Sequence, residues 1–194
     1  INAGSRQGDS ASLEAEVNRL EEQRVPLENA VERILEEQIK ETLAELGIFH
    51  LLDNYVGGKV SFPPVNFALE RPPHLLVVSP RDRIERVREI TLQRDISLEE
   101  IENIEGEVDK LGVSSLVVEL GGLGATYPSF VTSEAGLRST IDAAAEEWLH
   151  QYLVFKPLGF RYLLDLIGVS RNYEIVTMNE TLASMVSKEI GSLV

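Results

Sequence analysis

The apolar side chains of a highly charged N-terminal segment constrain the fold more than any other feature of the sequence. These side chains are Leu13, Val17, Leu20, Leu27, Val31 and Ile34. They recur at alternating spacings of four and three residues, and Arg24 fills the one polar position of the series. This heptad-like spacing predicts an α-helix with a narrow apolar seam. Pro26 interrupts the segment, and a proline inside a helix costs about 3 kcal/mol. The segment is therefore either one kinked helix or two helices, and we favour two, with Pro26 in the first turn of the second.

The helical pattern continues to Gly47, a residue type that commonly ends helices. Residues 1–12 are small and polar, and we expect them to form a loose end. We therefore predict a charged helical arm over residues 1–47, followed by a domain over residues 48–194. The arm is expected to pack on its own domain. The alternatives are a coiled coil with a second copy, which would make a homodimer, and a stalk beside a membrane.

The remainder of the chain mixes strand-like and helix-like segments without regular alternation of the two, which predicts an α+β fold. Strands are expected over residues 74–80 and 114–122, both rich in Leu and Val. Helices are expected over residues 97–112, which open with a capping box of Ser97 and Glu100, over a segment starting at Ser139 or Asp142, and over residues 157–168 and 179–191. Residues 173–178, "YEIVTM", are expected to form a short strand or a loop.

Charge and composition exclude several classes of function. The formal net charge of −14 disfavours nucleic acid and anionic lipid as partners, because both need clustered Lys and Arg. The absence of cysteine excludes disulfides and thiolate metal ligands. No apolar run reaches the roughly 18–20 residues of a membrane span. Because both ends look trimmed, a signal peptide or membrane anchor is expected outside these residues, and an extracytoplasmic or membrane-anchored location is favoured over a cytoplasmic one.

The stretch "AAAEEWLHQYLVF", residues 143–155, carries the most chemistry. Glu146 and His150 are four residues apart and therefore lie on one face of a helix, with Glu147 beside them. Two ligands on successive turns can hold a metal ion while a carboxylate between them takes a proton from water. By itself, the stretch fits a solvated acidic helix face with a surface histidine better.

A second motif, Asn179-Glu180-x-x-Ala183, begins another helix 29 residues beyond His150. With both motifs in this order, residues 113–191 resemble the gluzincin-type zinc metallopeptidases. The resemblance implies a zincin-like α+β domain in which His150 and Glu180 bind zinc and Glu147 is the general base. It also implies that a peptide or protein substrate pairs with an edge strand, which residues 114–128 would supply. Ala183 would let the two helices approach closely.

Glu146 departs from the family pattern, because it stands where the first histidine ligand is expected. It could bind the metal directly, which would make the site more negatively charged, harder and more tolerant of Mn or Fe. The site could instead have lost its metal, or the histidine could have been replaced in this sequence. We therefore predict a metal-dependent peptidase, with a catalytically silent zincin-like binding or scaffold domain of the cell envelope as the alternative, and an unrelated acidic α+β domain as a third reading.

The other candidate side chains are aromatic. Tyr152, Tyr162 and Tyr173 lie near the motifs, and one of them could donate a hydrogen bond to an oxyanion, although a structural role is expected for each. His50 and His74 lie beside apolar runs far from the motifs and are expected to be structural.

Overall fold

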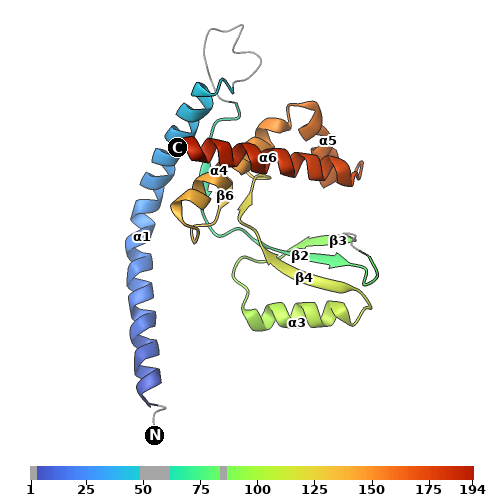
Figure 1. The fold of residues 1–194 in the computed structure, drawn as a ribbon. Coiled ribbons are helices and arrows are strands. Elements are labelled where there is room, and N and C mark those ends of the chain that lie inside the picture. The colour runs from blue at the N-terminus through green and yellow to red at the C-terminus, as the bar shows by residue number, and fades with distance from the viewer. Residues whose placement is uncertain (1–3, 49–61, 84–86) are drawn as a thin grey trace.

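The computed structural model describes residues 4–48, 62–83 and 87–194 and has the α+β architecture expected from the sequence (Figure 1). The strands form two small sheets, one in the order β1-β6-β5 and one in the order β3-β2-β4. The elements in chain order are α1 (Gly4–Glu45), β1 (Phe67–Leu69), β2 (His74–Ser79), β3 (Arg88–Thr91), α3 (Leu98–Asp109), β4 (Ser114–Glu119), β5 (Gly122–Leu123), β6 (Ser129–Val131), α4 (Leu137–Leu153), α5 (Pro157–Leu166) and α6 (Tyr173–Leu193).

The N-terminal segment is a single helix, so the favoured prediction of two helices is wrong. Pro26 lies inside α1 on an exposed stretch, where water can bind the carbonyl group that proline leaves without a partner. The loose end predicted for residues 1–12 is also wrong from Gly4 onward, because α1 begins there. Once a helix is nucleated, each further residue adds one hydrogen bond, and small polar residues can therefore extend it.

The C-terminal half of α1 packs into the body of the protein. Leu35, Ile39 and Leu43 are at most 4% exposed and share one core with Trp148 of α4. The residues expected to form an arm and those expected to form a domain therefore have a common core.

Two carboxylates of α1 bind the backbone of β1, one of the two outer strands of its sheet. Glu36 accepts a hydrogen bond from the backbone N–H of Phe67 at 3.0 Å, and Glu32 accepts one from Leu69 at 2.6 Å. These bonds occupy N–H groups that an edge strand would otherwise leave open. Burial raises the pKa of Glu36 above its usual value, although the bond from Phe67 acts in the opposite direction.

The two sheets have different connections to the helices. β1 is parallel to β6, and β5 is antiparallel to β6; this sheet packs against α4. β2 pairs antiparallel with both β3 and β4, and α3 packs on β4 away from α1 (Figure 1). The predicted capping box of Ser97 and Glu100 is confirmed at the start of α3.

The last helix is longer than predicted. Residues 173–178, expected to form a strand or a loop, are the first turns of α6, so that prediction is wrong. The side chain of Asn172 accepts a hydrogen bond from the backbone N–H of Ile175 at 3.1 Å and caps the helix six residues earlier than the motif suggested. α4 also begins earlier than expected, at Leu137.

Two further expectations concern membranes and histidines. Within the described ranges, no helix has the length and hydropathy needed to cross a bilayer.

His74 is buried in β2 with Nδ1 at 3.2 Å from the carbonyl oxygen of Gln93, which fits the expected structural role. His50 lies outside the described residues.

The shared core makes a prediction about α1. Leu43→Ala should lower the free energy of unfolding by about 2–5 kcal/mol, because Leu43 is fully buried and its truncation leaves a cavity. Leu27→Ala on the same helix should change it by no more than about 0.5 kcal/mol, because Leu27 is 61% exposed. Urea denaturation followed by far-UV circular dichroism measures both, and equal effects would contradict the packing of α1 described above.

Candidate metal centre

α4 presents an apolar face to the core and an acidic face to α6. Its buried residues include Ile141, Ala145, Trp148 and Leu149, and the indole N–H of Trp148 donates a hydrogen bond to the carbonyl oxygen of Pro63 at 2.7 Å. This packing fixes the rotation of the helix about its axis. As a consequence, the other face carries Glu146 and His150 towards α6.

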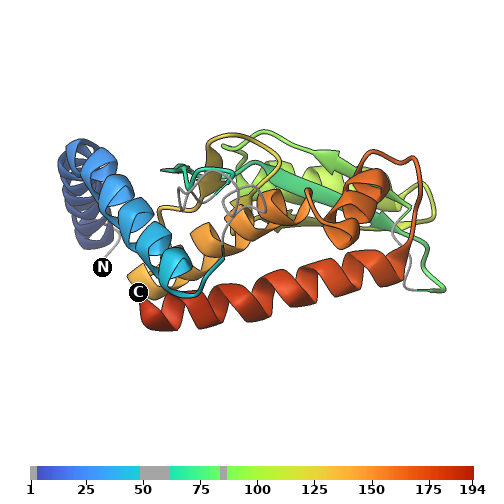
Figure 2. The ribbon, with the colours of Figure 1, turned by 90° about the horizontal axis from the view of Figure 1, so that it is seen from above.

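α6 runs alongside α4 and packs closely against it (Figure 2). Three of its buried residues are small or polar: Asn179, Ala183 and Ser187 are fully buried. Small side chains let two helix backbones approach, as expected for Ala183. Glu180 thereby faces the acidic side of α4.

Three of the predicted site residues converge. The ligand atoms of Glu146, His150 and Glu180 all lie within 4.8 Å of one another, and Nε2 of His150 is 3.5 Å from Oε2 of Glu180. Two ligands bound to one zinc ion at about 2.1 Å can be at most about 4.2 Å apart. Small side-chain rotations therefore suffice for all three to bind one ion, and one imidazole with two carboxylates suits Zn, Mn or Fe.

Tyr162 of α5 holds two of these residues in place. Its hydroxyl donates a hydrogen bond to Oε1 of Glu180 at 2.6 Å, and its ring stacks on His150 with 5.5 Å between the ring centroids. Tyr152 instead stacks on Trp148, and Tyr173 is 76% exposed at the start of α6. Of the three tyrosines singled out in the sequence, Tyr162 is therefore the one that its hydrogen bond and ring contact place against the cluster.

Asn179 sets the orientation of the histidine ring. Its amide nitrogen is 2.8 Å from Nδ1 of His150, and among the described residues its buried Oδ1 has no hydrogen-bond partner. The two ends of an asparagine amide are interchangeable by a rotation of the side chain. With Oδ1 turned to the ring, Nδ1–H would donate to it and leave the lone pair of Nε2 facing Glu180, as a metal ligand requires.

Glu147 lies beside the cluster, under the turn that contains β5. A Cβ atom added to Gly122 would be 2.3 Å from Oε1 of Glu147, and one added to Gly124 would be 2.6 Å from Oε2. The backbone N–H of Gly124 also donates a hydrogen bond to this carboxylate. Burial raises the pKa of Glu147 to about 7, against the opposing effects of His150 and Gly124 and with a further increase from Glu146.

The net effect of burial and neighbouring charges is to raise the pKa values of Glu146 and His150. Burial and the charge of Glu180 raise the pKa of Glu146, while His150 and Lys188 lower it. Burial alone would lower the pKa of His150, but the hydrogen bond and charge of Glu180, together with the charges of Glu147 and Glu146, raise it. Three carboxylates thus surround one imidazole, an arrangement that a bound cation would stabilise.

Several residues that shape this site were not predicted from the sequence. Lys188 is eight residues beyond Glu180, a spacing of about two helical turns that could have placed it on the same face. Gly122 and Gly124 were visible only as a glycine-rich turn, because nothing in the sequence links them to Glu147. Tyr162 was one of three equivalent candidates.

No protein-family model matches the sequence, and neither the curated proteins nor the solved structures provide a match.

The contact between Glu147 and the glycine turn makes a prediction about stability. Gly124→Ala should lower the free energy of unfolding by about 1–3 kcal/mol, because the new methyl group would lie 2.6 Å from Oε2 and 2.9 Å from the backbone oxygen of Glu147. Gly121→Ala is the matched control, since a Cβ atom there meets nothing within 4 Å. Thermal unfolding measures both. Indistinguishable melting curves would refute the close contact.

Proposed function

We propose that the protein is a metal-dependent hydrolase that cleaves peptide bonds, with a zincin-like arrangement of α4 and α6. Glu146, His150 and Glu180 would hold the ion, which is zinc or, given two carboxylate ligands, Mn or Fe. The observation that carries the proposal is the convergence of these three side chains, which come from two helices and lie within 4.8 Å of one another. The resemblance of both motifs to gluzincins points to the same chemistry.

Each residue of the site would have its own role in hydrolysis. Bound to these ligands, a divalent ion would polarise the scissile carbonyl group and a water molecule. Glu147 would take a proton from that water as its oxygen attacks the carbonyl carbon, and would pass the proton to the amide nitrogen as the C–N bond breaks. Tyr162 would hold Glu180 by the hydrogen bond to Oε1, and Asn179 would fix the ring of His150.

An extended peptide could pair with the strand beside Glu147. β5 is the outer strand of the sheet β1-β6-β5, and outer strands can add a substrate segment as a further strand. The segment 114–128, expected to supply an edge strand, contributes β4 and β5, which are outer strands of different sheets. β5 is the one whose residues contact Glu147.

A catalytically silent zincin-like domain, binding peptides or serving as a scaffold of the cell envelope, is the second candidate. Both carboxylate oxygens of Glu147 lie against the backbone of Gly122 and Gly124, which favours a packed role for this side chain over one in proton transfer. The replacement of the first histidine by Glu146 points in the same direction.

A measurement of metal binding tests whether the cluster residues bind a metal and other acidic residues do not. Calorimetric titration of the chelator-treated protein with Zn²⁺ and Mn²⁺ should show one ion bound per chain. His150→Ala and Glu180→Ala should weaken binding by more than tenfold, because each removes a ligand. Glu174→Ala, a change to an exposed glutamate in the first turn of the same helix, should have no effect.

One further variant and two possible results of the titration test the metal site. Glu146→His should strengthen zinc binding, because it restores the ligand type of the resembled family at a position that faces the other two. A wild-type protein that binds neither ion, or an equal loss with Glu174→Ala, would reject the metal site.

Activity distinguishes the two candidate functions. Glu147→Gln should keep the metal affinity within a few-fold and lower the rate of cleavage of a quenched fluorescent peptide library by at least about 10²-fold, the usual contribution of a general base. The peptidase proposal fails if the metal-loaded wild-type protein cleaves nothing or if Glu147→Gln is as active as the wild type; metal binding without cleavage would favour the silent domain.

A further inference from the structure

The apolar seam of α1 does not face the body of the protein. Its members are between 38% and 67% exposed: Leu13, Val17, Leu20, Leu27, Val31 and Ile34. The helix uses another face to pack, through the buried Leu35, Ile39 and Leu43. The N-terminal half of α1 projects from the rest of the molecule (Figure 1).

The seam has the geometry of one strand of a coiled coil. Its residues occupy d and a positions across four successive heptads, with Arg24 at one a position, and this spacing pairs two helices through knobs-into-holes packing. In this register Pro26 is at a c position, which lies on the outside of a two-stranded coiled coil. The continuous helix through Pro26 therefore leaves the seam unbroken.

The charges beside the seam indicate what kind of helix can pack there. The e and g positions that flank it, at residues 14, 16, 21, 23, 28, 30, 35 and 37, include five glutamates and no lysine or arginine. Two copies of α1 would bring acidic residues together along both flanks, and in a parallel pair they would also place Arg24 against Arg24 at one a position. Like charges at these positions disfavour pairing. The homodimer considered from the sequence is therefore disfavoured by its own charges.

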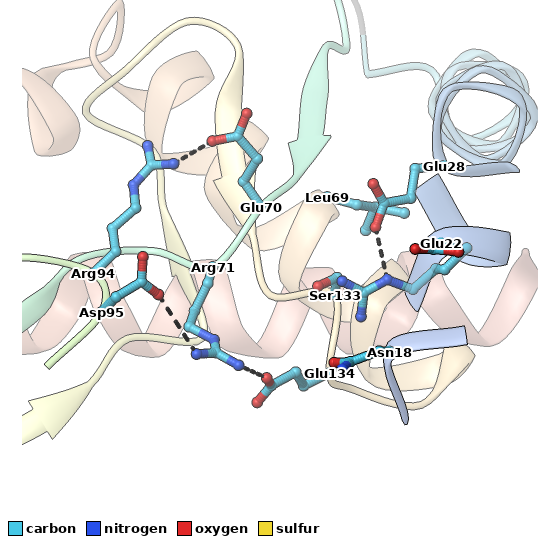
Figure 3. A pocket seen from close by; sticks show the side chains of 11 residues that line it. Asn18, Glu22, Glu28, Leu69, Glu70, Arg71, Arg94, Asp95, Ser133 and Glu134 are labelled. Carbon is cyan, nitrogen blue, oxygen red and sulfur yellow. Dashed lines mark hydrogen bonds and ion pairs between the residues drawn. The ribbon is translucent and has the colours of Figure 1, made fainter. Parts of the chain in front are cut away.

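A polar cleft beside α1 is a weaker candidate for a binding site. This cleft of about 780 Å³ lies between α1 and the segment that follows β1, and its three arginines are Arg24, Arg71 and Arg94 (Figure 3). Each is already paired with a carboxylate of the chain: Arg24 with Glu28 at 3.0 Å, Arg71 with Asp95 and Glu134, and Arg94 with Glu70. Five carboxylates also line the cleft, so its described residues carry no net positive charge for an acidic ligand, whereas the seam has exposed apolar area.

We propose that the seam of α1 binds an amphipathic helix of another protein, with apolar residues at its own a and d positions and lysine or arginine beside them. An acidic residue of the partner would face Arg24, next to its ion pair with Glu28. This docking surface is separate from the metal centre. The proposal therefore does not depend on the proposed hydrolase activity.

Synthetic helices test the proposal directly. A fluorescent peptide of about four heptads, with Ile at a, Leu at d, Lys at e and g, and one Glu at the a position that faces Arg24, is titrated with the full chain and followed by anisotropy. A second peptide of the same length carries Glu in place of every Lys. The basic peptide should bind at least tenfold more tightly than the acidic one, and added salt should weaken its binding.

Matched variants locate the binding on α1. Leu27→Ser should weaken binding of the basic peptide by at least tenfold, and Ala15→Ser, at an exposed position outside the seam, should not change it. Equal binding of the two peptides, or no effect of Leu27→Ser, would overturn the proposal. Self-association in analytical ultracentrifugation that Leu27→Ser abolishes would also overturn it, because the occupant of the seam would then be a second copy.

Discussion

The close approach of α6 to α4 is the constraint on which the rest of the site depends. The buried residues of α6 include the small or polar Asn179, Ala183 and Ser187, and the helix packs closely against α4. This spacing brings Glu180 to His150 and lets Asn179 reach the ring from the other side. A larger side chain at position 183 would push the helices apart and would separate the two halves of the proposed ligand set, which come from segments about thirty residues apart in the chain.

The core holds α4 in the orientation that this approach requires. Trp148, 2% exposed and hydrogen-bonded to Pro63, packs in the same cluster as Leu35, Ile39 and Leu43 of α1. α1 therefore has two faces with different roles. One face completes the core and binds the backbone of β1 through Glu32 and Glu36, and the other displays the apolar seam. The acidic cluster is thus built on rigid helices, and like charges are kept together there at an electrostatic cost that a cation would remove.

Local patterns in the sequence predicted much of the fold and the central cluster of the site. Helical spacing was enough to place Glu146 and His150 on one face of α4, and the capping box located the start of α3. Interactions between distant segments were not predictable in this way. The contact of Glu147 with Gly122 and Gly124, and the hydrogen bond from Tyr162 to Glu180, depend on how the turn and α5 pack against α4 and α6. The early start of α6 depends on the single cap at Asn172, which the β-type composition of the next residues obscured.

The central claim is that Glu146, His150 and Glu180 bind one metal ion together. An anomalous difference map from crystals grown with Zn²⁺ and recorded at the zinc absorption edge tests it most directly. The account predicts one strong peak about 2.0–2.2 Å from Nε2 of His150 and from one oxygen of each carboxylate. A map without a peak between these three residues, or with zinc bound only elsewhere on the acidic surface, would contradict it.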